Sequence, residues 1–142
     1  MADEMRGLRL KVLPDTYNLI RVNTELWSQI LSDPSLSPRM SVPFMIFKTE
    51  SDFLLLLDDA DAMGIKSKIP RDDFESGTRV IEVRSTQGLR DPNGFNDLVR
   101  AVLAGGISVR CISSWDADFV VISQDELGSA LKLLSPFIEE LC

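Results

Sequence analysis

The segment from Ser113 to Asp118, SSWDAD, holds the densest set of side chains that could bind or react with a small molecule. It places two hydroxyls, an indole and two carboxylates close together. Carboxylates form charge-assisted hydrogen bonds with ammonium and guanidinium groups, and hydroxyls can donate or accept beside them. We therefore expect a recognition site at this corner. The alternative is an ordinary polar turn, because the same residue types are common in turns.

Two β-strands are expected to hold this corner. Ile107–Ile112 alternates with the two-residue period of a strand, and Phe119–Ile122 is a continuous apolar run, typical of a central strand buried on both faces. A helix before them is predicted over Phe95–Leu103, where apolar residues recur at helical spacing. Gly105-Gly106 supplies the left-handed residue that commonly ends a helix.

Composition excludes most catalytic chemistry. The chain has no histidine and only two cysteines. A Ser-His-Asp triad or a Cys-His pair therefore cannot form within it, and the usual zinc ligand sets are missing. No phosphate-binding loop or dinucleotide fingerprint is present. We expect no enzyme activity, metal or cofactor. An enzyme acting through carboxylates such as Asp116 and Asp118 is the remaining catalytic alternative.

The charge and the apolar pattern bear on partners and location. The net charge of −7 argues against binding to nucleic acid, whose phosphates require a basic surface, and against anionic membrane surfaces. The longest apolar run, Phe53–Leu57, is far shorter than the roughly 20 residues that span a bilayer. The first ten residues lack an apolar signal core. We therefore expect a cytoplasmic protein.

The remaining elements are predicted from periodicity and turn signals. Leu8–Leu13 and Tyr17–Val22 flank the turn signal Pro14-Asp15-Thr16, so we expect an opening hairpin. A stretch from Asp58 to Gly77 has the composition of a connector between two halves. Further strands are expected at Phe44–Lys48, Phe53–Leu57 and Thr78–Arg84. Further helices are expected at Thr24–Leu31 and from a capping box at Ser123–Glu126 through Leu134. Ser135-Pro136 predicts a last short helix or a kink.

The two halves show signs of a duplication. Lys48–Asp59 and Ser114–Asp125 superimpose at an offset of 66, with an Asp-Phe pair in register. The first half has a corresponding polar corner, in which Thr49 and Asp52 are the expected counterparts of the polar residues at Ser113–Asp118. Similar strand order in both halves predicts an α+β fold of two ferredoxin-like units, each an antiparallel sheet with helices on one face.

The second half resembles a known family. Residues 104–134, AGGISVRCISSWDADFVVISQDELGSALKLL, are similar to the ACT-like domain of small bacterial proteins and CASTOR-type arginine sensors. The family pattern has a strand ending in Ile-Ser-Thr, an aromatic residue, and Thr-Asp-aromatic opening the next strand. Here Ser114 and Ala117 replace the usual threonines. The first half fits more loosely, and family members of this length are tandem pairs of ACT-like units, which we expect at residues 1–70 and 71–142.

The resemblance implies that the protein binds an effector rather than catalyses a reaction. ACT domains bind amino acids at interfaces between units, using the first strand–helix loop and facing strand ends. Carried over by position, that loop is Gln87–Gly94. The implied ligand-binding residues are Asn93, Gly94, Ser113, Ser114, Trp115 and Asp118, with Asp116 as a further candidate. Gly94 would admit a ligand carboxylate, Trp115 would cover the ligand, and Asp118 would pair with a basic group.

We therefore expect a small regulatory protein, an allosteric sensor that binds an amino acid, with a basic one as a candidate. Shared binding surfaces imply a homodimer that signals to a regulated protein partner. The alternative is a protein-interaction module that keeps the ACT-like fold and has lost the ligand. The substitutions at Ser114 and Ala117 motivate this alternative.

Overall fold

The computed structural model describes residues 7–141, and side-chain burial through residue 138. Contacts within the chain divide it into two compact units. We call Asp15–Thr78 the N-terminal unit. The described residues before Asp15 and from Arg79 onward form the C-terminal unit. Both contain helices and antiparallel strands, which confirms the predicted α+β class.

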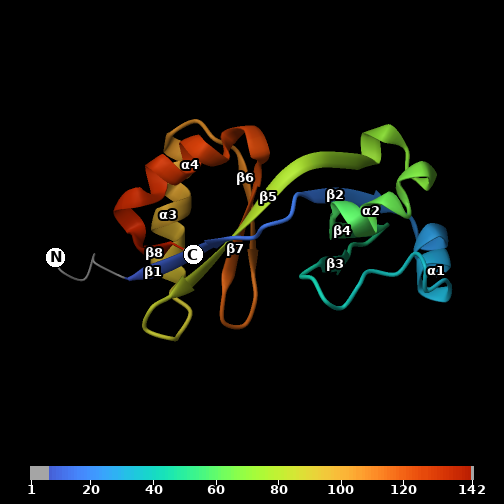
Figure 1. Ribbon diagram of the computed structural model, residues 1–142, viewed down its shortest axis with the longest axis horizontal. Helices are drawn as coiled ribbons and strands as arrows, with labels where there is room; N and C mark the ends of the chain where they lie inside the picture. The colour runs from blue at the N-terminus through green and yellow to red at the C-terminus, as the bar shows by residue number, and fades with distance from the viewer. Residues whose placement is uncertain (1–6, 142) are drawn as a thin grey trace. The chain divides into compact units, whose positions relative to one another are not determined.

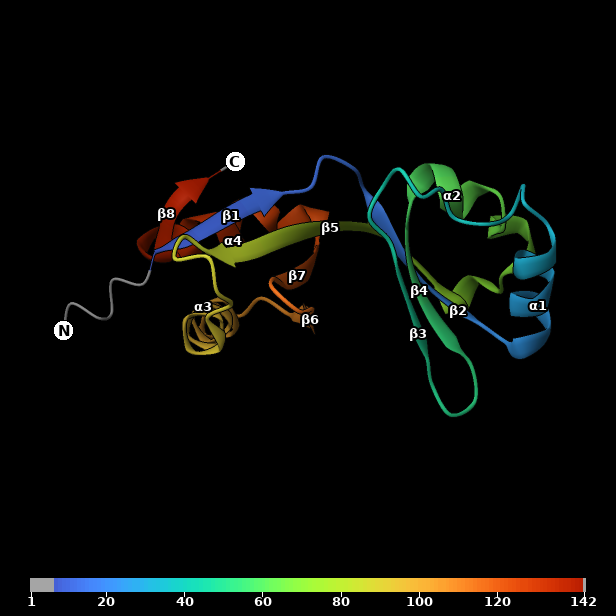
Figure 2. The ribbon, with the colours of Figure 1, turned by 90° about the horizontal axis from the view of Figure 1, so that it is seen from below.

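The N-terminal unit contains strands in the order β3-β4-β2-β5, each antiparallel to its neighbour. Figure 2 shows β3 and β4 as a hairpin. Its core joins Ile20 and Leu55 of the sheet to Leu26 and Ile30 of the first helix. Its elements are β2 (Tyr17–Val22), α1 (Thr24–Ser32), β3 (Met45–Lys48), β4 (Phe53–Asp58), α2 (Asp59–Met63), the 3₁₀ turns η2 (Lys66–Lys68) and η3 (Arg71–Asp73), and the first residues of β5 (Phe74–Ser85).

In the C-terminal unit the sheet order is β8-β1-β5-β7-β6, with only the β1–β8 pair parallel among the pairs described. Its elements are β1 (Leu8–Val12), the rest of β5, α3 (Pro92–Ala104), β6 (Val109–Ser113), β7 (Asp118–Ser123), the 3₁₀ turn η4 (Gln124–Glu126), α4 (Leu127–Leu134), the 3₁₀ turn η5 (Ser135–Phe137) and β8 (Ile138–Leu141). The helices α3 and α4 and the strands are labelled in Figure 1.

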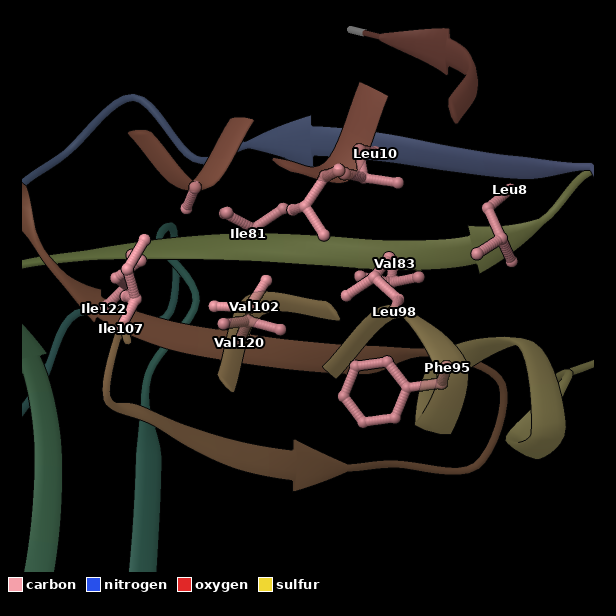
Figure 3. Packing of buried hydrophobic residues seen from close by; sticks show 12 residues of the cluster. Leu8, Leu10, Ile81, Val83, Phe95, Leu98, Val102, Ile107, Val120 and Ile122 are labelled. Atoms are coloured by element: carbon pink, nitrogen blue, oxygen red, sulfur yellow. The ribbon is translucent and has the colours of Figure 1, made fainter. Parts of the chain in front are cut away.

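One apolar cluster holds the C-terminal unit together. Figure 3 shows side chains of β1, β5 and β7 gathered with those of α3, among them Leu10, Ile81, Leu98 and Val120. Leu10, Ile81 and Leu98 are fully buried. Burying a side chain of this size contributes roughly 1.5–3 kcal/mol, so this cluster stabilises the packing of β1, β5 and β7 against α3.

The helix boundaries follow the expected local chemistry. The Asn23 side chain accepts a hydrogen bond from the backbone N–H of Leu26 at 2.8 Å and caps α1. Asp91 accepts from the N–H of Gly94 at 2.9 Å and caps α3 in the same way. Gly106 has φ +84°, which confirms the glycine stop after α3.

Long-range pairing overturns one predicted local feature. The opening hairpin is wrong: β1 and β2 each pair with β5, through Val12 with Ile81 and Tyr17 with Thr78. The expected division at residues 70–71 also differs from the compact units, because β1 belongs with the C-terminal half of the chain. The last short helix or kink expected at Ser135-Pro136 is the 3₁₀ turn η5, and β8 follows it.

Tyr17 is a buried tether in the N-terminal unit. Its side chain is 1% exposed, and its hydroxyl donates a hydrogen bond to the Pro43 carbonyl at 3.0 Å. Burial, followed by the nearby Asp15 and Asp58 carboxylates, raises the pKa of Tyr17 to about 12. The neutral phenol is therefore favoured in the folded chain.

Because Tyr17 is the single tyrosine, tyrosinate absorbance reports on this residue alone. An unfolded tyrosine ionises near pH 10, so the stability that Tyr17 contributes is complete below about pH 10 and is lost as the pH rises toward 12. The loss amounts to about 3 kcal/mol. We expect the absorbance transition of the folded protein near pH 12, or coincident with unfolding followed by circular dichroism. A folded protein that ionises near pH 10 would contradict this environment.

Candidate ligand-binding site

The predicted corner, Ser113–Asp118, is a tight turn between β6 and β7. Ser113 and Asp118 are register partners at the end of the two strands. Between them, the N–H of Ser114 donates to the Ala117 carbonyl at 2.8 Å, and the Ser114 hydroxyl donates to the same oxygen at 3.0 Å. The Ser114 hydroxyl is therefore used in closing the turn.

Asp118 is the centre of a closed polar network. Its carboxylate is 3% exposed and lies 2.7 Å from Nε of Arg90. The Ser113 hydroxyl donates to the same carboxylate oxygen at 2.6 Å, and Nη2 of Arg90 donates to Ser113 Oγ at 3.0 Å. The cation that a basic ligand was expected to bring to Asp118 is supplied by the chain's own Arg90.

The other predicted residues lie in separate surroundings. Trp115 is 97% exposed, and Asp116 forms an ion pair with Arg84 at 3.3 Å. Gly94 is buried, but its N–H already donates to Asp91, while Asn93 is exposed in the first turn of α3. The structure thus brings Ser113 and Asp118 together. Ligand contact by any of these residues stays a prediction.

Sequence reasoning did not single out Arg90, although it lies inside the expected loop Gln87–Gly94. A signal was available in principle, since a buried carboxylate requires a cation or several hydrogen-bond donors. Arg90 is the only basic residue in that loop. The burial of Asp118 could not be predicted from the sequence, because Asp118 and its partner Arg90 are 28 positions apart in the chain.

The β3–β4 and β6–β7 hairpins correspond in a different register from the one that the sequence match indicated. In the first half, Thr49 donates to the Asp52 carbonyl at 2.8 Å, as Ser114 does to Ala117. Lys48 pairs with Phe53 as Ser113 pairs with Asp118. These equivalences give an offset of 65, with Asp52 matching Ala117 and Phe53 matching Asp118. The expected offset of 66 is therefore corrected by one residue.

The N-terminal unit has an open cavity at its own corner, with a volume of about 230 Å³. The cavity lies at the junction of β2 with α1, beside the β3–β4 turn and the segment that precedes β5. Apolar groups from Val22, Leu26, Ile69 and Pro70 form part of its wall. Its remaining lining is polar and comprises Arg21, Asn23, Ser51, Asp52, Lys68 and Asp73.

Charges of both signs face this cavity. Arg21 donates from Nε to Asp73 at 3.0 Å and lies 3.8 Å from Asp52. Hydrogen bonding to Asp73 and its negative charge raise the pKa of Arg21, so the guanidinium stays charged. Lys68 adds a second cation to the lining. Such an arrangement matches a small zwitterion, whose ammonium and carboxylate groups need partners of opposite sign.

Cys111 is the one cysteine among the described residues. Partial burial, followed by the Asp118 carboxylate, raises the pKa of the Cys111 thiol. This thiol therefore stays protonated, and less nucleophilic, at neutral pH. The same residues contain no cluster of three or more metal-ligating side chains. None of their helices is long and apolar enough to cross a bilayer.

Several solved structures resemble this chain at low sequence identity. A Vibrio cholerae protein of unknown function has a TM-score of 0.70 and 19% identity, with 97% of each chain covered. The regulatory subunit of Thermus flavus aspartate kinase has a TM-score of 0.61 and 10% identity, covering 94% of this chain and 97% of that chain. Clostridium acetobutylicum aspartate kinase has a TM-score of 0.68 and 14% identity, covering 94% of this chain and 34% of the kinase.

These likenesses define the fold class. The chain has the fold of the regulatory chains of aspartate kinases, which supports the ACT-like fold that the sequence resemblance implies. No protein-family model and no curated protein matches the sequence. At identities this low, ligand and partner do not transfer with the fold.

Loss of Arg90 should cost much more stability than loss of an exposed arginine. In Arg90→Ala the nearly inaccessible Asp118 carboxylate loses its cation, and we expect a loss of about 2 kcal/mol in the free energy of unfolding. The matched control is Arg100→Ala, which breaks an exposed pair with Asp97 and should cost less than about 1 kcal/mol. Urea unfolding measures both. Equal costs would contradict the buried network.

Proposed function

We propose that this protein is a non-catalytic regulatory protein that binds an amino acid in the cavity of its N-terminal unit. The observation that carries the proposal is a 230 Å³ cavity with charges of both signs and an apolar wall. Aspartate kinase regulatory chains share the fold, which supports a regulatory role. The cavity also lies at a strand–helix junction, the part of an ACT-like unit from which the sequence resemblance led us to expect ligand contacts.

The proposed architecture is a tandem pair of ferredoxin-like, ACT-like units. The N-terminal unit supports this with the element order β-α-β-β-α-β. In the C-terminal unit the same order starts at β5, and β1 is an extra strand beside it. We further propose that the protein acts as a cytoplasmic homodimer whose association with a regulated partner changes on binding. Such coupling requires the ligand to prefer one assembly over another.

The charged residues that line the cavity indicate which charges the ligand carries. Asp52 and Asp73 already lie beside Arg21, so we propose that the ligand's ammonium shares these two carboxylates with Arg21, and that Lys68 binds the ligand's carboxylate. The apolar wall then faces the ligand side chain. The earlier reason for expecting a basic amino acid was the Asp118 carboxylate, and that group already pairs with Arg90.

The direct test is a thermal-shift screen over the common amino acids at millimolar concentration. Ligand that binds only the folded state raises the unfolding midpoint, by a few degrees at ten times its Kd. Lys68→Gln should weaken binding of the selected amino acid about tenfold, because one charge-assisted contact is lost. Lys66→Gln is the matched control, since Lys66 lies two residues away, over the ring of Phe74 and outside the cavity lining.

The two variants separate specific binding from general charge effects. Retained affinity in Lys66→Gln with reduced affinity in Lys68→Gln would support the cavity. An equal effect of the two substitutions, or no shift with any amino acid, would overturn the proposal.

A protein-interaction module without ligand is the second candidate function. The observation that favours it is the corner of the C-terminal unit, where Arg90 already occupies the acceptors at Ser113 and Asp118. In this case amino acids would leave the midpoint unchanged, and Asp118→Ala would leave partner binding intact.

A further inference from the structure

The charges and the apolar wall of the N-terminal cavity together indicate the side chain of its ligand. The lining holds two cations, Arg21 and Lys68, and two carboxylates, Asp52 and Asp73. We propose that the ligand is an amino acid with an apolar side chain, and that Ile69 is a specificity-determining residue of the cavity. This inference rests on the proposed function and names the class of amino acid that the site selects.

An amino acid with an uncharged side chain preserves the charge balance of the lining. Its ammonium lies with Asp52 and Asp73 and its carboxylate with Lys68, so each ligand charge faces one of opposite sign. A basic side chain adds a third cation beside Arg21 and Lys68, and an acidic side chain adds a third anion. The lining holds no further charge to balance either one, and a partly desolvated charge without a partner weakens binding.

The remaining polar groups of the lining offer little to a polar ligand side chain. The side-chain oxygen of Asn23 accepts the N–H of Leu26 and is committed to the cap of α1. Asp52 already accepts a hydrogen bond from the Thr49 hydroxyl in the β3–β4 turn. Ser51 is exposed, so its hydroxyl can bond to water. A hydroxyl or amide on the ligand therefore exchanges water for few new partners.

Apolar contacts for the ligand come from two segments of the N-terminal unit. Val22 and Leu26 lie at the junction of β2 with α1, and Ile69 and Pro70 lie between η2 and η3. Val22 and Leu26 belong to the buried core, and Ile69 packs against it. The wall is therefore held in place before the ligand binds. Each CH₂ that a ligand buries against it strengthens binding about fourfold.

Ile69 is the residue of this wall best placed to discriminate between side chains. It follows Lys68, which binds the ligand's carboxylate in the proposed site. Ile69 is partly buried, whereas Val22 is sealed in the core and Pro70 is exposed. Shortening the side chain of Ile69 thus removes apolar contact from the cavity and leaves its charged groups in place.

The experiment is isothermal titration calorimetry with matched pairs of amino acids. Norleucine and lysine share the same straight carbon chain and differ in the terminal ammonium, while leucine and asparagine differ in polarity at similar size. We expect each apolar member to bind at least about tenfold more tightly than its counterpart. Glycine should bind at least about tenfold more weakly than leucine, because it has no side chain to place against the wall.

The substitution Ile69→Ser tests the wall itself. The Kd for leucine should rise about tenfold and the Kd for glycine should change less than about threefold, because only leucine reaches the wall. Leu36→Ser is the matched control, since Leu36 packs against the same core cluster and lies outside the cavity lining. It should leave both dissociation constants within about threefold of those of the unsubstituted protein.

Lysine or asparagine binding as tightly as its apolar counterpart would overturn the inference while leaving an amino-acid site intact. Equal rises in the Kd for leucine and for glycine in Ile69→Ser would overturn the role of Ile69. If that variant does not fold, Ile69→Val serves in its place and should raise the Kd for leucine about threefold with that for glycine unchanged. If no amino acid binds, the proposed function and this inference fall together.

Discussion

The carboxylate of Asp118, almost fully removed from water, is the constraint around which the C-terminal corner is built. A buried charge is tolerated only when it is paired and hydrogen-bonded. Asp118 meets this condition with Arg90 and Ser113. That requirement draws the loop before α3 onto the ends of β6 and β7, and it closes the corner that the sequence had marked as a ligand site.

The corresponding corner of the N-terminal unit has no buried charge at this strand end. The residue in the structural position of Asp118 is Phe53, which stacks on Trp27 with ring centroids 4.9 Å apart. An apolar residue at this strand end requires no cation, and β2 leads into α1 without an intervening loop. The charged groups Arg21 and Asp52 then face a cavity. The open corner of the N-terminal unit thus differs from the closed corner of the C-terminal unit in two ways. It has Phe53 where the other has Asp118, and it lacks the loop that precedes α3.

The sequence predicted local elements well and long-range relationships poorly. Periodicity placed Tyr17–Val22 at the observed bounds of β2, and the helix at Thr24 one residue short of its observed end. The turn signal at Pro14 suggested that β1 and β2 form a hairpin. This prediction was wrong because a local pattern cannot show that β5 is long enough to pair with both β1 and β2. The sequence match aligned the two corners one residue out of register. Identical residues in two segments do not determine how the strands of each segment pair.

The account's central claim is that the two corners differ, with the N-terminal one open to an amino acid and the C-terminal one filled. The most direct measurement is an NMR titration of the ¹⁵N-labelled protein with its best amino-acid ligand. The account predicts saturable shifts in the amides of Asn23, Leu26 and Asp52, with those of Ser113–Asp118 unmoved. Shifts centred on Ser113–Asp118, or none at either corner, would contradict it.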